Sequence, residues 1–138
     1  MKIQSYLNFE GGAEEALEFY QKAAGAQPGM IMRMKDSPEP HPGGMKAGTE
    51  NKIMHCEFTI GESMLLATDG FCSGKAEFKG VTLSLQAADE AEARRVFNAL
   101  ADGGNITMPI SKTFFSPCFG MLQDRFGVSW MVIVHAPV

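Results

Sequence analysis

The sequence has few of the features that mark secreted, membrane-spanning or nucleic-acid-binding proteins. Its 138 residues include only three cysteines, Cys56, Cys72 and Cys118, too few and too scattered for a disulfide framework or a Cys-x-x-Cys zinc site. The 12 Lys and Arg against 16 Asp and Glu give a net charge of -4, which excludes a broadly basic nucleic-acid-binding surface. No apolar run approaches the ~20 residues of a membrane helix, and residues 1–6 lack the apolar segment of a signal peptide. We therefore expect one cytoplasmic domain with free thiols and no nucleic-acid or membrane partner.

Two segments have apolar residues at helical spacing. Residues 14–24 form the first, bounded by Gly11-Gly12 and Gly25, because glycine readily supplies the left-handed residue that ends a helix. Asp89 and Glu92 fit a capping box at the start of the second. Its expected buried stripe consists of Ala93, Val96, Phe97, Leu100 and Ala101.

The remaining segments alternate between apolar and polar residues, which predicts strands. The expected strands cover residues 3–9, 30–34, 53–60, 63–68, 81–85, 105–110, 119–123 and 129–134. Within residues 53–60, one predicted face carries Met54, Cys56, Phe58 and Ile60, and the opposite face carries Ile53, His55, Glu57 and Thr59. Residues 35–51 contain several prolines and glycines and His41, so we expect a long loop there.

The expected elements follow one order twice. A strand, a helix and three strands fill residues 1–70, and the same order recurs in residues 78–138, which indicates an internal duplication. Each helix must bury its apolar stripe against one sheet face. We therefore predict an α+β fold in which two βαβββ modules form a curled, mostly antiparallel sheet. The helices lie on the outer face of this sheet, and the opposite face lines a central pocket. Ligands commonly bind in pockets of this kind.

Several motifs and their spacing resemble those of a known superfamily. They are Leu7-Asn8-Phe9 with Ala16-Leu17-Glu18-Phe19-Tyr20, then Met54-His55-Cys56-Glu57, Phe119-Gly120-Met121-Leu122-x-Asp124 and Phe126-Gly127-Val128-x-Trp130-Met131. The chain thus resembles the vicinal oxygen chelate superfamily, which includes glyoxalases, bleomycin-resistance proteins and extradiol dioxygenases. Within it the chain is similar to the PhnB-like branch, also labelled a 3-demethylubiquinone-9 3-methyltransferase domain. The resemblance implies the paired-module fold and a homodimer.

The resemblance also implies where a metal would be held in metal-using relatives. Their ligand positions fall on Gln4, on Thr82, near Leu66 and on Met131. A methionine thioether is unsuited to the hard ions that oxygen-containing substrates need, and threonine is a neutral ligand. We therefore expect no cofactor and no metal site of the superfamily type. The sequence also lacks the G-x-G-x-x-G turn of a Rossmann-type cofactor site.

His55 and Glu57 are the strongest catalytic candidates. Because they lie two residues apart on a strand, they point to the same face. A carboxylate beside an imidazole favours acid–base chemistry, anchoring of a polar ligand or a displaced metal site. The alternative is a cross-strand polar pair on a half-exposed sheet.

The remaining candidates would line the pocket. They are Gln4, Tyr6, Thr82, Phe115, Phe119, Met121 and Met131. Tyr6 offers a hydroxyl, and methionine adapts to an irregular apolar cavity. Packing in an ordinary core is the alternative for Tyr6 and the methionines. Phe114, Phe115 and Phe119 cluster around Pro117 just before a predicted strand, and a dimer contact is the alternative for this aromatic loop. Asp124 to Gly127 read as a turn between strands.

Three functions fit these residues. The first is a small-molecule-binding protein without the usual metal site. The second is an enzyme of the same superfamily, with lyase, dioxygenase or transferase chemistry at His55 and Glu57. The third is a structural or partner-binding dimer whose pocket is filled by its own side chains.

Overall fold

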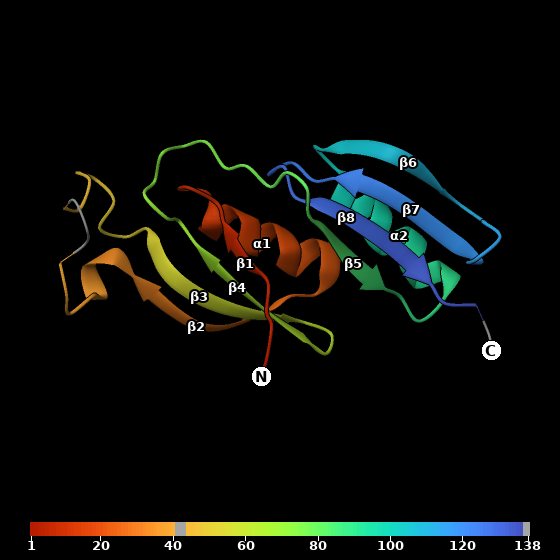
Figure 1. Ribbon diagram of the computed structural model, residues 1–138, viewed down its shortest axis with the longest axis horizontal. Coiled ribbons are helices and arrows are strands. Elements are labelled where there is room, and N and C mark those ends of the chain that lie inside the picture. The colour runs from red at the N-terminus through yellow and green to blue at the C-terminus, as the bar shows by residue number, and fades with distance from the viewer. Residues whose placement is uncertain (41–43, 137–138) are drawn as a thin grey trace. The chain divides into compact units, whose positions relative to one another are not determined.

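The computed structural model describes residues 1–40 and 44–136 and divides the chain into two compact units, Met1–Ala76 and Glu77–Val138. His41 lies outside the described residues. Unit 1 contains β1 (Tyr6–Asn8), α1 (Ala13–Ala24), β2 (Gln27–Arg33), the short 3-10 helix η1 (Met34–Asp36), β3 (Ile53–Ile60) and β4 (Ser63–Thr68). Unit 2 contains β5 (Thr82–Gln86), α2 (Glu90–Ala101), β6 (Asn105–Ser111), β7 (Cys118–Gln123) and β8 (Ser129–Val134). Both units are shown in Figure 1.

Each unit has a four-stranded mixed sheet with the same topology. The strand orders are β1-β4-β3-β2 and β5-β8-β7-β6. The pairings of β1 with β4 and of β5 with β8 are parallel, and the other pairings are antiparallel. The α+β class and the two strand-helix-three-strand modules are therefore confirmed. The hydrogen bonds join the strands into two open sheets, one in each unit.

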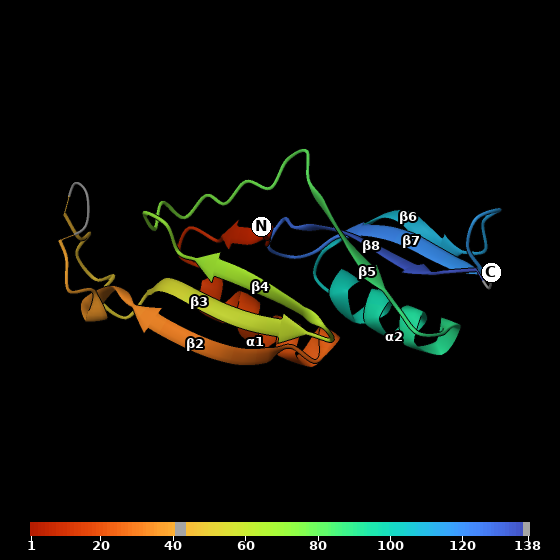
Figure 2. The same cartoon turned by 60° about the horizontal axis from the view of Figure 1, so that its bottom comes forward.

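One helix packs on one face of each sheet, as Figure 2 shows. In unit 1, fully buried Tyr20 of α1 stacks on Phe58 of β3, with ring centroids 6.0 Å apart. In unit 2, the backbone N–H of Glu92 donates to the Asp89 carboxylate at 2.8 Å, so the predicted cap of α2 is confirmed. Among the described residues, no helix has the length and apolarity needed to cross a membrane.

The register of the two sheets is equivalent. In unit 1 the helix-facing residues Leu7, Ala67 and Cys56 lie side by side across β1, β4 and β3. In unit 2 the corresponding row is Leu83, Trp130 and Leu122 across β5, β8 and β7. From these rows, His55 is equivalent to Met121, and Tyr6 to Thr82. The open face of each unit, defined as the sheet face opposite its helix, can therefore be compared position by position.

Some predicted strand boundaries were wrong, and so was the face on which Ile53 lies. The strand predicted at residues 30–34 is β2, which covers Gln27–Arg33. Ile3 and Val81 are exposed because β1 and β5 begin only where a parallel partner strand is available, at Tyr6 and Thr82. Ile53 is fully buried, although simple alternation placed it beside His55. The ladder between β2 and β3 is irregular between Met32 and Arg33, and Arg33 pairs with Ile53. A bulge of this kind breaks the two-residue period.

A buried aspartate holds each unit together at a chain junction. In unit 1 the carboxylate of fully buried Asp69 accepts hydrogen bonds from the backbone N–H groups of Gly11 at 3.0 Å, Ala13 at 2.8 Å and Ile53 at 2.7 Å. These bonds join the end of β4 to the start of α1 and the start of β3. A buried carboxylate needs such partners because burial without them is very costly.

In unit 2, Asp124 has the corresponding stabilising role in a turn. Its carboxylate accepts bonds from the backbone N–H groups of Phe126 at 2.9 Å and Val128 at 3.0 Å and from the Trp130 indole at 2.9 Å. Gly127 has φ 93°, so the predicted turn is confirmed and its glycine is explained. The neighbouring Gly120 allows close packing, since a Cβ there would lie 2.7 Å from the Phe97 ring of α2.

We predict that Asp69→Asn destabilises unit 1 by about 2–4 kcal/mol, because the amide places a donor against a backbone N–H donor. Urea unfolding followed by circular dichroism measures this change. Glu62→Gln, which removes the same charge in the exposed turn between β3 and β4, serves as the control and should shift the unfolding free energy by less than about 0.5 kcal/mol. Equal effects of the two substitutions would contradict the structural role of Asp69.

Cys56 makes the free energy of unfolding depend on pH in the alkaline range. Burial and the charge of Asp69 raise the pKa of its thiol to about 11, whereas an unfolded thiol ionises near about 8.5. The contribution of the protonated Cys56 thiol to the free energy of unfolding is thus complete below about pH 8.5. It is lost as the pH rises toward 11, and the free energy of unfolding then falls by about 1.4 kcal/mol per pH unit near pH 10. Unfolding free energies of the wild type and Cys56→Ala between pH 8 and 11 test this, and parallel pH profiles would contradict it.

Candidate functional site

The open face of unit 1 brings together two of the predicted site residues. The Tyr6 hydroxyl on β1 lies 3.2 Å from Nδ1 of His55 on β3. Their rings meet edge to face, with centroids 5.5 Å apart and an interplanar angle of 85°. This contact links β1 and β3 across β4, which separates them in the sheet. A phenol and an imidazole in hydrogen-bond contact can together donate or accept a proton at one place.

Glu57 lies on the same open face as His55, as the two-residue spacing predicts. Both side chains are half-buried. Glu57 and Tyr6 each pair with Leu66 of β4, so these three residues form one row across the sheet. The hydrogen-bonding partner of Nδ1 of His55 is the Tyr6 hydroxyl.

Gln4 precedes β1 and is half-buried. Within the described part of the chain, its amide Nε2 is buried without a hydrogen-bond partner. A buried donor without a partner costs about 1–3 kcal/mol, so this amide favours an acceptor that the protein itself does not supply. By sheet register, Tyr6 and not Gln4 is equivalent to Thr82.

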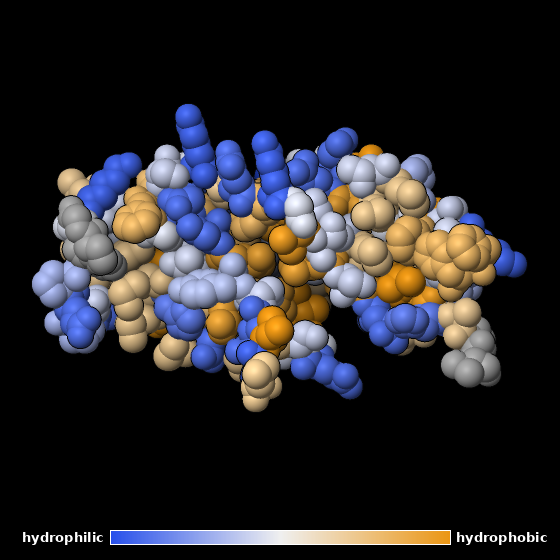
Figure 3. Space-filling model, viewed as in Figure 1, coloured by the Kyte–Doolittle hydropathy of each residue, from blue (hydrophilic) through white to orange (hydrophobic). Residues whose placement is uncertain are grey.

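The open face of unit 2 carries a row of three methionines, which we call the thioether row. Met108 of β6, Met121 of β7 and Met131 of β8 pair directly across the sheet, and Ser84 of β5 completes the row. The Ser84 hydroxyl donates to the Met131 sulfur at 3.6 Å. Figure 3 shows apolar side chains gathered over the strands of this unit. The thioether row gives this face a flexible, polarisable surface.

Phe115 and Phe119 adjoin the thioether row through the loop before β7. Their rings pack edge to face with centroids 5.0 Å apart, and Phe119 is buried opposite Ile133. Ser116 fixes this loop, because its buried hydroxyl donates to the Cys118 carbonyl at 2.8 Å. Sequence reasoning missed Ser116, since a serine next to a proline suggests only a turn. Thr82 lies apart from these rings, exposed opposite Ser129.

The two units therefore present different chemistry on equivalent scaffolds. His55 in unit 1 corresponds to Met121 in unit 2, and Glu57 corresponds to Gln123. The face of unit 1 has an imidazole, a phenol and a carboxylate, while the face of unit 2 has thioethers. Trp130 and Cys118 are buried as predicted, and His135 is exposed.

The residues at the implied metal positions do not fit a hard divalent ion. Met131 offers a thioether sulfur that already accepts a hydrogen bond from the Ser84 hydroxyl. Thr82 offers only a neutral hydroxyl, and Leu66 has no atom that could bind a metal. Gln4 alone has a suitable oxygen, and one neutral ligand does not hold such an ion. Within the described ranges, no three His, Cys, Asp or Glu residues are grouped so that they could hold a metal.

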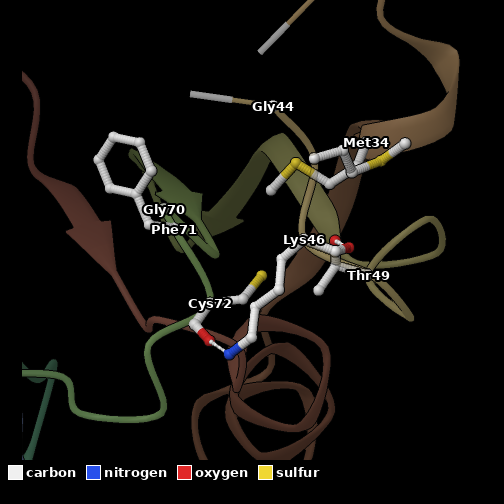
Figure 4. Close-up of a pocket in the computed structure, with 8 residues that line it drawn as sticks. Met34, Gly44, Lys46, Thr49, Gly70, Phe71 and Cys72 are labelled. Carbon is white, nitrogen blue, oxygen red and sulfur yellow. Dashed lines mark hydrogen bonds between the residues drawn. The ribbon is translucent and has the colours of Figure 1, made fainter. Parts of the chain in front are cut away.

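A separate pocket lies in unit 1, and none of the predicted site residues lines it. Met34, Met45, Lys46, Phe71 and Cys72 are among its lining residues (Figure 4). The sequence contains no signal for it, because the loop after β2 and the turn after β4 meet only in the folded unit.

Comparisons with known proteins match nearly the whole chain. The model of the family described as 3-demethylubiquinone-9 3-methyltransferase matches residues 1–133. Protein YjdN of Escherichia coli K12 is 35% identical, with 97% of this chain and 95% of YjdN covered. The crystal structure of PA1353 from Pseudomonas aeruginosa is 39% identical over 98% of both chains, with a TM-score of 0.84.

Two further solved structures extend the comparison. The PhnB protein from Bacillus cereus is 32% identical, with 97% of this chain and 99% of that chain covered and a TM-score of 0.78. A glyoxalase/bleomycin resistance protein from Albidiferax ferrireducens is only 15% identical over 89% of both chains, with a TM-score of 0.59. The second likeness concerns the fold alone.

We predict that Tyr6→Phe changes the tautomer balance of His55, because the hydroxyl that bonds to Nδ1 is lost. Nitrogen-15 spectra of the imidazole should show a shifted Nδ1 resonance of His55, with the resonances of exposed His135 unchanged as an internal control. The unfolding free energy should fall by less than about 1 kcal/mol, since the contact is exposed. Identical His55 spectra in both proteins would contradict the contact.

Proposed function

Because the chain belongs to the 3-demethylubiquinone-9 3-methyltransferase family, the PhnB-like branch of the glyoxalase/bleomycin-resistance fold, we propose that it binds a small, partly apolar organic molecule. The observation that carries this proposal is the thioether row on the open face of unit 2. The proposal includes no metal site of the superfamily type, because the residues at the implied ligand positions are unsuited to one.

The thioether row suits an apolar or aromatic ligand. Unbranched methionine side chains adapt to the shape of a ligand, and sulfur makes favourable contacts with aromatic rings. Phe119 and Phe115 border the same surface, and Ser84 adds a hydroxyl. Covering about 150 Å² of apolar surface contributes about 4 kcal/mol before the cost of association is subtracted, so one aromatic fragment should bind only weakly.

The name of the family suggests methyl transfer, but the chain lacks the glycine-rich turn of a Rossmann-type methyl-donor site. Gly11-Gly12 follow β1 without a G-x-G-x-x-G pattern, and the N–H groups of Gly11 and Ala13 donate to the Asp69 carboxylate. The proposed function therefore does not include methyl transfer.

The second candidate function is acid–base catalysis on the open face of unit 1. The hydrogen bond between His55 and Tyr6 favours it, and Glu57 lies on the same face. In this alternative, His55 moves a proton to or from a bound substrate while Tyr6 orients the imidazole. A displaced metal site around His55 and Glu57 belongs to the same alternative.

We further propose that the protein is a cytoplasmic homodimer. All three cysteines are free thiols in the structure, which suits a reducing compartment. The edge strand β6 exposes Ile106, and Phe114 is fully exposed in the following loop. Exposed aromatic side chains such as Phe114 are enriched at protein interfaces.

Methionine-methyl NMR tests the proposed binding. We expect millimolar indole or 2-naphthol to shift the methyl resonances of Met121 and Met131 and to leave that of exposed Met30 unchanged. Met131→Glu, which places a charge in the row, should weaken binding at least about tenfold, whereas the control Met30→Glu should not.

Two results would contradict this function. The first is the absence of any shift at Met121 and Met131 with either compound. The second is a stoichiometric divalent ion in protein purified without chelator that is lost in His55→Ala, which would favour the enzymatic alternative.

A further inference from the structure

The pocket in unit 1 is lined by three sulfur-containing side chains, and we call it the sulfur pocket. They come from separate segments, Met34 from η1, Met45 from the following loop and Cys72 from the turn after β4. The space measures about 310 Å³, counting the part that is open to solvent. Met34 is buried, Cys72 half-buried and Met45 exposed, so the pocket runs from the core to the surface.

The two lining side chains that carry oxygen or nitrogen, Thr49 and Lys46, each donate a hydrogen bond to the backbone. The Thr49 hydroxyl donates to the Lys46 carbonyl oxygen at 2.5 Å, and the Lys46 ammonium donates to the Cys72 carbonyl oxygen at 3.2 Å. The Asp69 carboxylate, which does not line the pocket, accepts three backbone N–H groups. The candidate ligand atoms among the lining side chains are the thiol of Cys72 and the two thioethers, and all three are soft donors.

The backbone fixes the direction of the Cys72 side chain. Cys72 has φ 55°, a left-handed conformation that is uncommon for residues other than glycine. Two bonds hold this conformation, one from the Cys72 N–H to the Asp69 carbonyl at 2.9 Å and one from the Ser73 N–H to the Glu10 carboxylate at 2.9 Å. Figure 4 shows Cys72 turned toward the space that Met34 also borders.

We propose that the sulfur pocket binds one soft monovalent metal ion, Cu(I) or Ag(I), through the Cys72 thiolate and the thioethers of Met45 and Met34. A set of sulfur ligands selects such ions over hard divalent ions. Methionine has three rotatable side-chain bonds, so Met45 in its exposed loop can close over the ion. This site is independent of the small-molecule site on unit 2.

Binding exchanges a proton for the metal. The Cys72 thiol loses its proton to solvent, a metal–sulfur bond forms, and the oxidation state of the ion does not change. Burial raises the pKa of the Cys72 thiol, and Asp69 and Glu10 act in the same direction while Lys52 and Lys46 oppose them. Because the metal displaces the proton of this thiol, the apparent affinity should rise with pH, by about tenfold per pH unit while the thiol is protonated in the free protein.

Competition with bicinchoninate under anaerobic conditions tests the proposal on the full chain. We expect one equivalent of Cu(I) to be bound, with an affinity that falls at least about 100-fold in Cys72→Ser and about tenfold in Met45→Leu. Met30→Leu, at an exposed methionine on β2, is the matched control and should bind as the wild type does. Ag(I) titration provides a redox-inert check.

Several outcomes would overturn the proposal. Unchanged affinity in Cys72→Ser, with a native circular dichroism spectrum, would exclude the thiolate as a ligand. Wild-type affinity in both Met45→Leu and Met34→Leu would show that neither methionine is a ligand and that the ion binds to the Cys72 thiol alone. Loss of binding in Met121→Leu would place the ion on the thioether row, and equal affinity for Zn(II) would contradict the selection for soft ions.

Discussion

The buried carboxylate of Asp69 is the interaction on which unit 1 depends. It is fully buried and accepts three backbone N–H groups from the start of α1 and the start of β3. These bonds fix where the helix leaves the sheet, and they also fill the helix N-terminus that an anionic cofactor would otherwise use. The Asp69 carbonyl oxygen also helps to hold Cys72 in its left-handed conformation. Asp69 thus anchors two chain junctions of the unit with its carboxylate and holds the turn at Cys72 with its backbone carbonyl.

The two units show how one scaffold can present two kinds of chemistry. Their strand orders and registers are equivalent, so His55 and Met121 occupy the same place on their open faces. The helix-facing rows remain apolar in both units because each must cover a helix. The open faces carry no such requirement, and there unit 1 has titratable groups and unit 2 has thioethers. The two candidate functions, binding of an apolar molecule and proton transfer, therefore belong to the open faces of different units.

The sequence predicted the elements better than the contacts of the candidate site. Apolar spacing located both helices and nearly every strand, and the Asp124 turn followed from ordinary turn chemistry. The candidate residues His55 and Glu57 were placed on one face by spacing alone, but the bond to Tyr6 was not foreseen. Ile53 was assigned to the wrong face, because the irregularity between β2 and β3 depends on the partner strand.

The sequence by itself determined the class of fold, the two modules and the family, since periodicity and short motifs are local properties of the chain. Only the tertiary structure decided which side chains meet. His55 and Tyr6 are 49 residues apart, and Asp69 is 58 residues from Gly11. Met34, Met45 and Cys72 likewise share a pocket only because the loop after β2 lies against the turn after β4. Strand pairing and loop placement set these contacts, and both follow from burial across the whole unit.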